Sequence, residues 1–132
     1  MAVVSLSMQP LDAFTNRMSW GPLGAGDSGE PAQVWAYPYL TMSCTGAPDN
    51  VADKGYPIID IFGSIEDPTS LCWGPLFTIT PPPDMFYRLN DPIIRLDAHP
   101  RVCSIKPIAR PGSNLNTVGI LILAARPWGF RS

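Results

Sequence analysis

The sequence predicts an all-β fold: a single-domain β-sandwich or jelly roll of about eight short strands with proline-rich loops and extended arms. Proline accounts for 16 of the 132 residues, more than double the usual share of ~5%. Because proline interrupts helices and central strands, long elements are excluded. Between the proline and glycine clusters lie short runs of apolar and β-branched residues, which is the pattern of strands. The length is that of one domain with its own core.

The strongest strand is expected at Thr117–Ala125, within the longest proline-free interval. Its apolar run hardly alternates, so we expect a central strand that is buried on both faces. Gln33–Cys44 alternates well but contains Pro38, which indicates an edge position or a bulge. The other expected strands are Val3–Met8, Ile58–Ile65, Leu76–Thr80, Met85–Leu89, Ile93–Leu96 and Val102–Ile108.

Two segments before residue 32 are expected to lie outside strands. Leu11–Arg17 follows Pro10 and offers room for one or two helical turns. The stretch Gly21–Pro31 is rich in glycine and reads as a flexible loop or an arm on the surface. A C-terminal docking tail is expected at residues 126–132.

The charge content is low and limits the possible partners. Only 15% of the residues are charged, and the net charge is −2, whereas average proteins carry about 25% charged residues. A surface with so few charges suggests that neighbouring proteins cover much of it. The arginines are scattered and form no basic run, so direct nucleic-acid binding is not expected. The sequence shows neither a membrane-spanning apolar stretch nor a signal peptide.

The three cysteines, Cys44, Cys72 and Cys103, are odd in number and widely spaced. They predict buried thiols in a reducing compartment rather than a disulfide framework. A zinc site built from them and His99 would lack the usual C-x-x-C spacing. The loop Asp49–Asp53 has oxygen ligands, yet it lacks the spacing of a calcium loop and favours an Asx-rich turn. No metal or cofactor is expected, although ion binding at His99 or at this loop stays open.

The tetrapeptide GDSG at Gly26–Gly29 resembles the nucleophile motif of trypsin-like serine proteases. The resemblance implies Ser28 as a nucleophile beside an oxyanion hole made by backbone N–H groups. It covers four residues and ends at Glu30, where a further glycine belongs. The base would be His99, the only histidine, which could equally serve a cysteine. A small Ser or Cys hydrolase is therefore an alternative, but we expect no enzymatic activity.

The tetrapeptide WGPL occurs twice, at Trp20–Leu23 and at Trp73–Leu76, in flanks that do not match. We interpret each copy as an aromatic anchor followed by a Gly-Pro turn and a leucine that re-enters the core, rather than as a true repeat. The C-terminal tail combines aromatic residues and arginines, the types enriched at interfaces. The expected interface residues are Trp20, Leu23, Trp73, Leu76, Arg126, Trp128, Phe130 and Arg131.

These features favour a structural subunit of a large assembly. By analogy of build, the assembly would be a virus or bacteriophage particle, with the chain as a capsid, decoration (cement) or tail component assembled in a reducing cytoplasm. Its partners would be copies of itself or other shell proteins, held by aromatic anchors and added strands. The main alternative is a β-sandwich carbohydrate-binding module that uses Trp20, Trp73, Tyr37 and Tyr39. Burial of those tryptophans would count against it.

Overall fold

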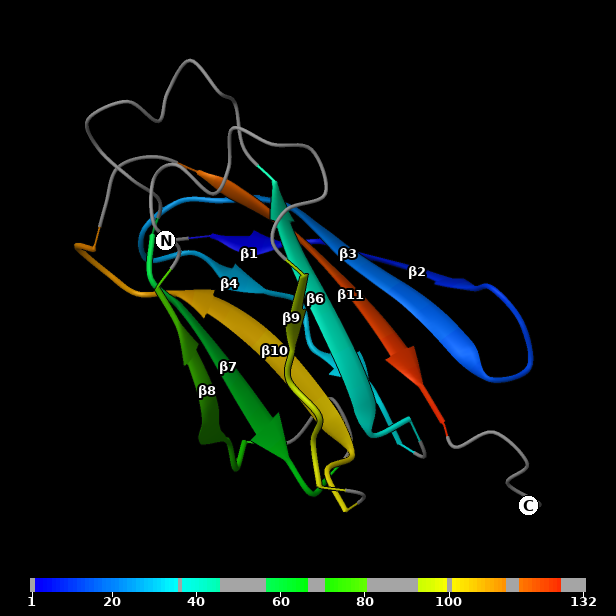
Figure 1. Ribbon diagram of the computed structural model, residues 1–132. Coiled ribbons are helices and arrows are strands. Elements are labelled where there is room, and N and C mark those ends of the chain that lie inside the picture. The colour runs from blue at the N-terminus through cyan, green and yellow to red at the C-terminus, as the bar shows by residue number, and fades with distance from the viewer. Residues whose placement is uncertain are drawn as a thin grey trace.

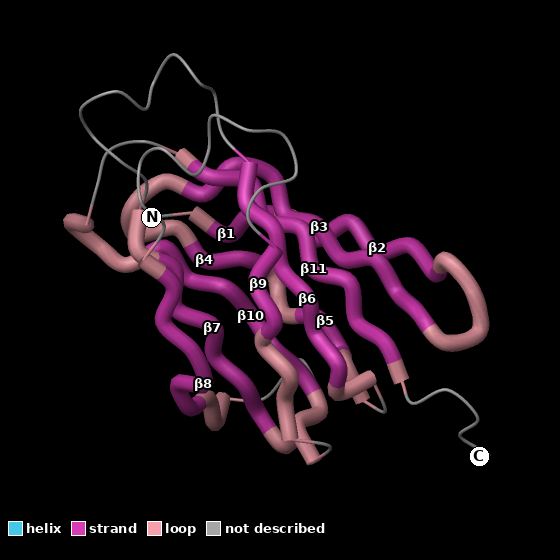
Figure 2. Tube along the Cα trace, in the orientation of Figure 1, coloured by secondary structure: helices cyan, strands magenta, loops and turns pink. Residues whose placement is uncertain are grey.

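The computed structural model describes residues 2–35, 37–45, 57–66, 71–80, 93–99, 101–113 and 117–126. These residues form two β-sheets and contain no helix, as Figures 1 and 2 show. The all-β class is thus confirmed. In this part of the chain no helix is long and apolar enough to cross a membrane. The expected strand Met85–Leu89, the loop Asp49–Asp53 and the tail residues Trp128, Phe130 and Arg131 lie outside the described residues.

Each sheet has a defined strand order. Sheet A runs β1-β4-β10-β7-β8, with β5 also paired to β10, and sheet B runs β2-β3-β11-β6-β9. The strands of sheet A are β1 (Val3–Val4), β4 (Ser28–Gly29), β5 (Ala32–Gln33), β7 (Ile59–Ser64), β8 (Gly74–Ile79) and β10 (Ser104–Ala109). The strands of sheet B are β2 (Leu6–Pro10), β3 (Thr15–Leu23), β6 (Tyr39–Thr45), β9 (Ile93–Arg95) and β11 (Val118–Ala125).

The antiparallel pairing of the strands is nested. Strand β7 pairs with β8, β6 pairs with β9, β4 and β5 pair with β10, and β3 pairs with β11. From β3 onward, the first half of the chain therefore pairs with the second half in reverse order. The two sheets share one core, because buried residues from both belong to a single apolar cluster.

Strand β11 is central in sheet B, between β3 and β6, as the sequence predicts. Its burial alternates, however: Val118, Ile120, Ile122 and Ala124 are buried and the residues between them are half-buried. The expectation of full burial on both faces is therefore wrong. Sheet B turns one face of this strand toward the shared core, and a strand with one core-facing side buries every second residue.

Pro38 separates two strands instead of forming a bulge in one. It lies between β5 and β6, and β6 has a partner strand on each side, so it is not an edge. Proline has no N–H group to donate to a ladder, which explains why the expected strand Gln33–Cys44 divides there.

The predicted helix at Leu11–Arg17 is wrong, because this segment makes the turn from β2 into β3. Asp12 Oδ1 accepts a hydrogen bond from the Phe14 N–H at 2.7 Å, and the Leu11 N–H donates to the Thr15 carbonyl at 2.9 Å. A short aspartate side chain that bonds the backbone two residues later favours a turn over a helix.

The stretch Gly21–Pro31 is also more ordered than the expected loop or arm. Its first residues belong to β3, and a tight turn then leads into β4. The turn is closed by the Asp27 N–H, which donates to the Gly24 carbonyl at 2.9 Å. Gly26 has a φ of 90°, a backbone conformation that favours glycine. The Gly26 N–H also donates to the Ala109 carbonyl at 2.8 Å, which ties the turn to β10.

Candidate functional site

The first WGPL unit lies in β3, and the last three residues of the second, Gly74–Leu76, lie in β8; each unit contains a β-bulge. In the first, Trp20 pairs with Ile120 and Leu23 with Val118, so β3 has one more residue than β11 over this interval. In the second, Pro75 pairs with Phe62 of β7. Phe77 pairs with the adjacent Ile61, so Leu76 is the extra residue of β8. The predicted Gly-Pro turn is therefore wrong. Bulges accept proline because they interrupt the ladder of N–H donors.

The first WGPL unit packs inside the protein. Trp20 is 3% exposed and Leu23 is fully buried. The Trp20 Nε1–H donates to the Glu30 carbonyl at 2.9 Å, so the polar atom of the indole is also satisfied. The chain's own core thus takes up the surface of both side chains.

The second WGPL unit lies on sheet A and keeps part of its surface exposed. The Lys106 Nζ lies 4.5 Å from the centroid of the half-buried Trp73 ring, within the range of a cation–π contact. Leu76 is 37% exposed. Of the predicted interface residues, these two therefore offer surface on this edge strand.

Arg126 follows the end of β11 and lies close to two aromatic rings. Its guanidinium carbon is 5.4 Å from the centroid of the Phe14 ring and 5.8 Å from that of the Tyr37 ring. Its backbone N–H donates to the Phe14 carbonyl at 2.9 Å. The Arg126 Nε is buried and has no hydrogen-bond partner among the described residues. Among the described residues, this cation thus contacts the rings of Phe14 and Tyr37 and forms no ion pair with an acid.

An apolar surface that the sequence analysis missed lies at the end of sheet A where β7 finishes and β10 begins. Trp35 is 53% exposed, Ile65 is 78% exposed and Leu71 is 95% exposed. Trp35, Ile65, Arg101 and Cys103 line an open hollow of about 480 Å³. The Cys103 backbone joins its walls, since its carbonyl accepts the Trp35 N–H at 3.1 Å and its N–H donates to the Ser64 carbonyl at 2.7 Å. We call these four residues the basic hollow.

Further large apolar side chains are exposed on sheet B, at the corresponding ends of its strands. Trp35 follows β5 of sheet A closely, and Tyr39 is the first residue of β6 of sheet B, whose starting end points to the bottom of Figure 1. Tyr39 is 43% exposed and pairs with Ala125, which in turn pairs with Thr15. Leu11, whose N–H bonds the Thr15 carbonyl, is 50% exposed. Together, Leu11, Trp35, Tyr39, Ile65 and Leu71 form what we call the apolar end.

The residues of the protease-like motif do not form a catalytic pair in the contacts of the described residues. The Ser28 hydroxyl lies 3.4 Å from the Gly29 carbonyl, and His99 Nδ1 accepts the Arg101 N–H at 3.0 Å. Gly29 is explained by packing, since a Cβ there would lie 2.6 Å from the Pro107 ring and 2.9 Å from the Trp20 ring.

The three cysteines are not disulfide-bonded, but they differ in exposure. Cys44 is buried, and burial raises the pKa of its thiol to about 12. Cys103 is half-buried in the basic hollow. Cys72 is exposed, so the expectation that all three thiols are buried is wrong. Nowhere in the described ranges do three or more His, Cys, Asp or Glu side chains gather as they would around a metal ion.

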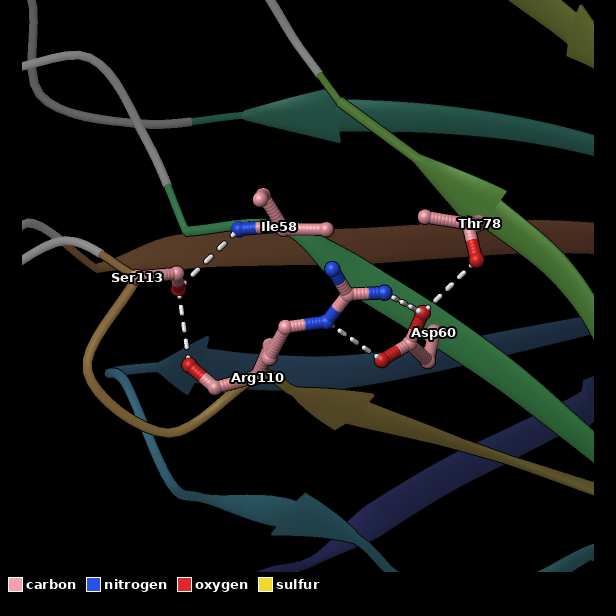
Figure 3. Close-up of polar contacts among 5 residues, drawn as sticks. All are labelled: Ile58, Asp60, Thr78, Arg110 and Ser113. Carbon is pink, nitrogen blue, oxygen red and sulfur yellow. Dashed lines mark hydrogen bonds and ion pairs between the residues drawn. The ribbon is translucent and has the colours of Figure 1, made fainter.

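A polar cluster joins the strands of sheet A at the end opposite the basic hollow, as Figure 3 shows. Asp60 of β7 accepts hydrogen bonds from Arg110 and, at 2.8 Å, from the Thr78 hydroxyl of edge strand β8. The Ser113 hydroxyl donates a hydrogen bond to the Arg110 carbonyl at 2.7 Å. It also accepts one from the Ile58 N–H at 3.2 Å. Hydrogen bonds from Arg110 hold the pKa of the Asp60 carboxyl below its ordinary value. The cluster fastens β8 to the sheet.

In comparisons with known proteins, no family model, curated protein or solved structure matches this chain. The apolar end and the basic hollow, which share Trp35 and Ile65, are the candidate functional site. Their signal in the sequence is slight: Ile65 and Trp35 are large apolar residues placed within two residues of a strand end, next to turn-forming segments.

Proposed function

We propose that this protein is a structural subunit of a large assembly and acts through protein–protein contacts. The observation that carries the proposal is the apolar end, where five large apolar side chains are exposed and two of them, Trp35 and Ile65, line one hollow with Arg101. Exposed apolar surface of this kind on soluble proteins is typical of interaction sites. Tryptophan and arginine are the residues that most often dominate the binding energy of an interface. The hollow beside Trp35 gives such an anchor a concave partner surface.

The nested strand pairing supports a jelly roll as the finer description of the two-sheet fold. A jelly roll is a double-sheet architecture in which a long antiparallel hairpin wraps into two Greek keys, and capsid proteins are among its users. Fold analogy alone does not define a function. Together with the apolar end and the low charge content, it favours a virion component, such as a capsid, decoration or tail protein.

The alternatives find less support in the geometry. A carbohydrate-binding face built on Trp20 and Trp73 needs both rings exposed, whereas Trp20 is 3% exposed and Lys106 lies over Trp73. A hydrolase needs a base near its nucleophile. The hydrogen bonds of Ser28 and His99 lead to their own neighbouring backbone instead.

Light scattering over a wide range of protein concentration tests the proposal. We expect the wild-type protein to form oligomers or particles, and a variant with Trp35→Ser and Ile65→Ser to remain monomeric at the same concentrations. Met8→Ser is the matched control, because Met8 is also apolar and 42% exposed but lies on β2, outside the apolar end. A double variant that assembles as the wild type does would contradict the proposal.

A further inference from the structure

The basic hollow presents an apolar floor and a positive charge. Trp35 and Ile65 supply exposed apolar surface, and Arg101 is exposed at the rim. Among the described residues, the ion pairs are Arg95 with Asp97 and Arg110 with Asp60, so Arg101 has no acidic partner in that set. A complementary surface would therefore offer an apolar side chain flanked by carboxylates.

Such a surface exists on this same chain, at the edge of sheet A formed by β1. Val3 is 73% exposed and pairs with Ser28. Asp27 and Glu30 lie on either side of the strand that β1 pairs with, and neither forms an ion pair with a described residue. Asp27 accepts the Ala2 N–H at 3.1 Å. We call Val3, Asp27 and Glu30 the acidic edge.

The carboxylates of the acidic edge are held in place by the backbone. Glu30 Oε1 accepts the Leu6 N–H at 2.9 Å, and Asp27 Oδ2 accepts the Gly24 N–H at 2.9 Å. These bonds fix the two acids beside the N-terminal strands without neutralising them. A fixed charge loses less conformational freedom on binding than a mobile one.

The acidic edge and the basic hollow lie at opposite ends of β10. The Asp27 carbonyl accepts a hydrogen bond from the N–H of Ala109, the last residue of β10, at 2.8 Å. The Trp35 N–H bonds the carbonyl of Cys103, directly before β10 begins. One molecule therefore cannot place its own edge in its own hollow, whereas two molecules can meet there.

We infer that the acidic edge of one copy binds the basic hollow of the next, in a head-to-tail contact that rests on the proposed structural function. Val3 enters the hollow against Trp35 and Ile65, while Asp27 and Glu30 face Arg101. Because the two surfaces differ, the contact is heterologous, and repeating it produces a closed ring or an open filament rather than a two-fold dimer. The charge pairs make the contact sensitive to salt.

Two complementary variants test this arrangement. The hollow variant carries Trp35→Ser and Arg101→Glu, and it keeps an intact edge. The edge variant carries Val3→Ser, Asp27→Asn and Glu30→Gln, and it keeps an intact hollow. The two amides retain oxygen acceptors for the backbone N–H groups. If a multiple variant fails to fold by circular dichroism, the single changes Arg101→Gln and Glu30→Gln take its place, with dissociation constants measured by analytical ultracentrifugation.

We expect each variant alone to be monomeric at concentrations where the wild type assembles, and an equimolar mixture to form a one-to-one heterodimer that grows no further. Each single change should weaken association roughly tenfold, as truncating a charge partner at an interface does. Variants that assemble alone, or a mixture that stays monomeric while the wild type assembles, would overturn the head-to-tail contact and leave the proposed function standing. A wild-type protein that stays monomeric at every concentration would contradict both the head-to-tail contact and the proposed function.

Discussion

Arg110 and Asp60 form a two-bond ion pair that joins the end of β10 to β7. The Arg110 Nη2 lies 2.9 Å from Asp60 Oδ1, and the Nε lies 3.1 Å from Oδ2. Because Asp60 also accepts the Thr78 hydroxyl, a single carboxylate connects three neighbouring segments of sheet A. This pairing supports the sheet whose far end carries the basic hollow.

The ion pair predicts a loss of stability in acid. Hydrogen bonds from Arg110 lower the pKa of Asp60 in the folded state below its ordinary value of 3.8. The unfolded chain therefore binds the proton first as the pH falls, so the stabilisation present above pH 3.8 is lost as the pH drops through the lower, folded pKa. Asp60→Asn should be less stable at neutral pH and less sensitive to acid, by urea unfolding. Equal acid sensitivity in the variant and the wild type would contradict this role, and Thr78→Val, which keeps the ion pair, is the control.

Gly29 is predicted to tolerate no side chain. A Cβ at this position would lie 2.6 Å from Pro107 and 2.9 Å from Trp20, both within the packed interior. Gly29→Ala should therefore reduce the free energy of unfolding by about 1–3 kcal/mol, as overpacking does. Gly74→Ala is the matched control, since a Cβ there meets nothing within 4 Å. Similar losses in the two variants, measured by denaturant unfolding, would show that close packing is not the cause.

The two WGPL tryptophans should differ sharply in their contribution to stability. Trp20 is buried and hydrogen-bonded, so Trp20→Ala should cost about 3–5 kcal/mol. Trp73 is half-buried directly before edge strand β8, and Trp73→Ala should lower the free energy of unfolding clearly less. Thermal and urea unfolding of both variants measure the difference. Equal losses of unfolding free energy in the two variants would contradict this difference.

The local pattern of the sequence was enough to predict the strands that became β7, β8, β10 and β11. Their apolar runs are continuous, and the turn-formers beside them are in the same local sequence. The turn at Leu11–Phe14 was missed because it depends on one aspartate side chain, which competes with helix formation. This hydrogen bond could not be predicted from composition or residue spacing.

The candidate site was mostly beyond the reach of local reasoning. Trp35 and Ile65 become neighbours only because Trp35 and Ser64, the residue before Ile65, both bond the backbone of Cys103, far along the chain. The bulges in the WGPL units likewise depend on partner strands that the tetrapeptide does not define. The aromatic content of the sequence favours tryptophan as an anchor, but whether a given tryptophan is buried or exposed depends on the tertiary arrangement.

Cys44 and Cys72 are predicted to differ in reactivity. Burial raises the pKa of Cys44 to about 12, so its thiol stays protonated at ordinary pH, and the reagent cannot reach it. Cys72 is exposed and should be alkylated by iodoacetamide in the folded protein. Peptide mass spectrometry identifies the modified residues, and the urea-unfolded protein, in which all three thiols react, is the control. Alkylation of Cys44 at the rate of Cys72 would contradict the buried position.

Substitutions of Arg126 separate the contribution of side-chain packing to stability from the contribution of the charge. Its contacts with Phe14 and Tyr37 are worth about 0.5–1 kcal/mol each as exposed cation–π pairs. Its buried, unpaired Nε costs about 1–3 kcal/mol, which offsets that gain. Arg126→Met keeps an unbranched apolar side chain against the rings, so its unfolding free energy should lie within about 1 kcal/mol of the wild type. Arg126→Ala removes the packing as well and should be the less stable variant.

Arg95→Ala, at an exposed ion pair, is the control and should change little. If methionine destabilises the protein as much as alanine does, the guanidinium itself stabilises this end of β11.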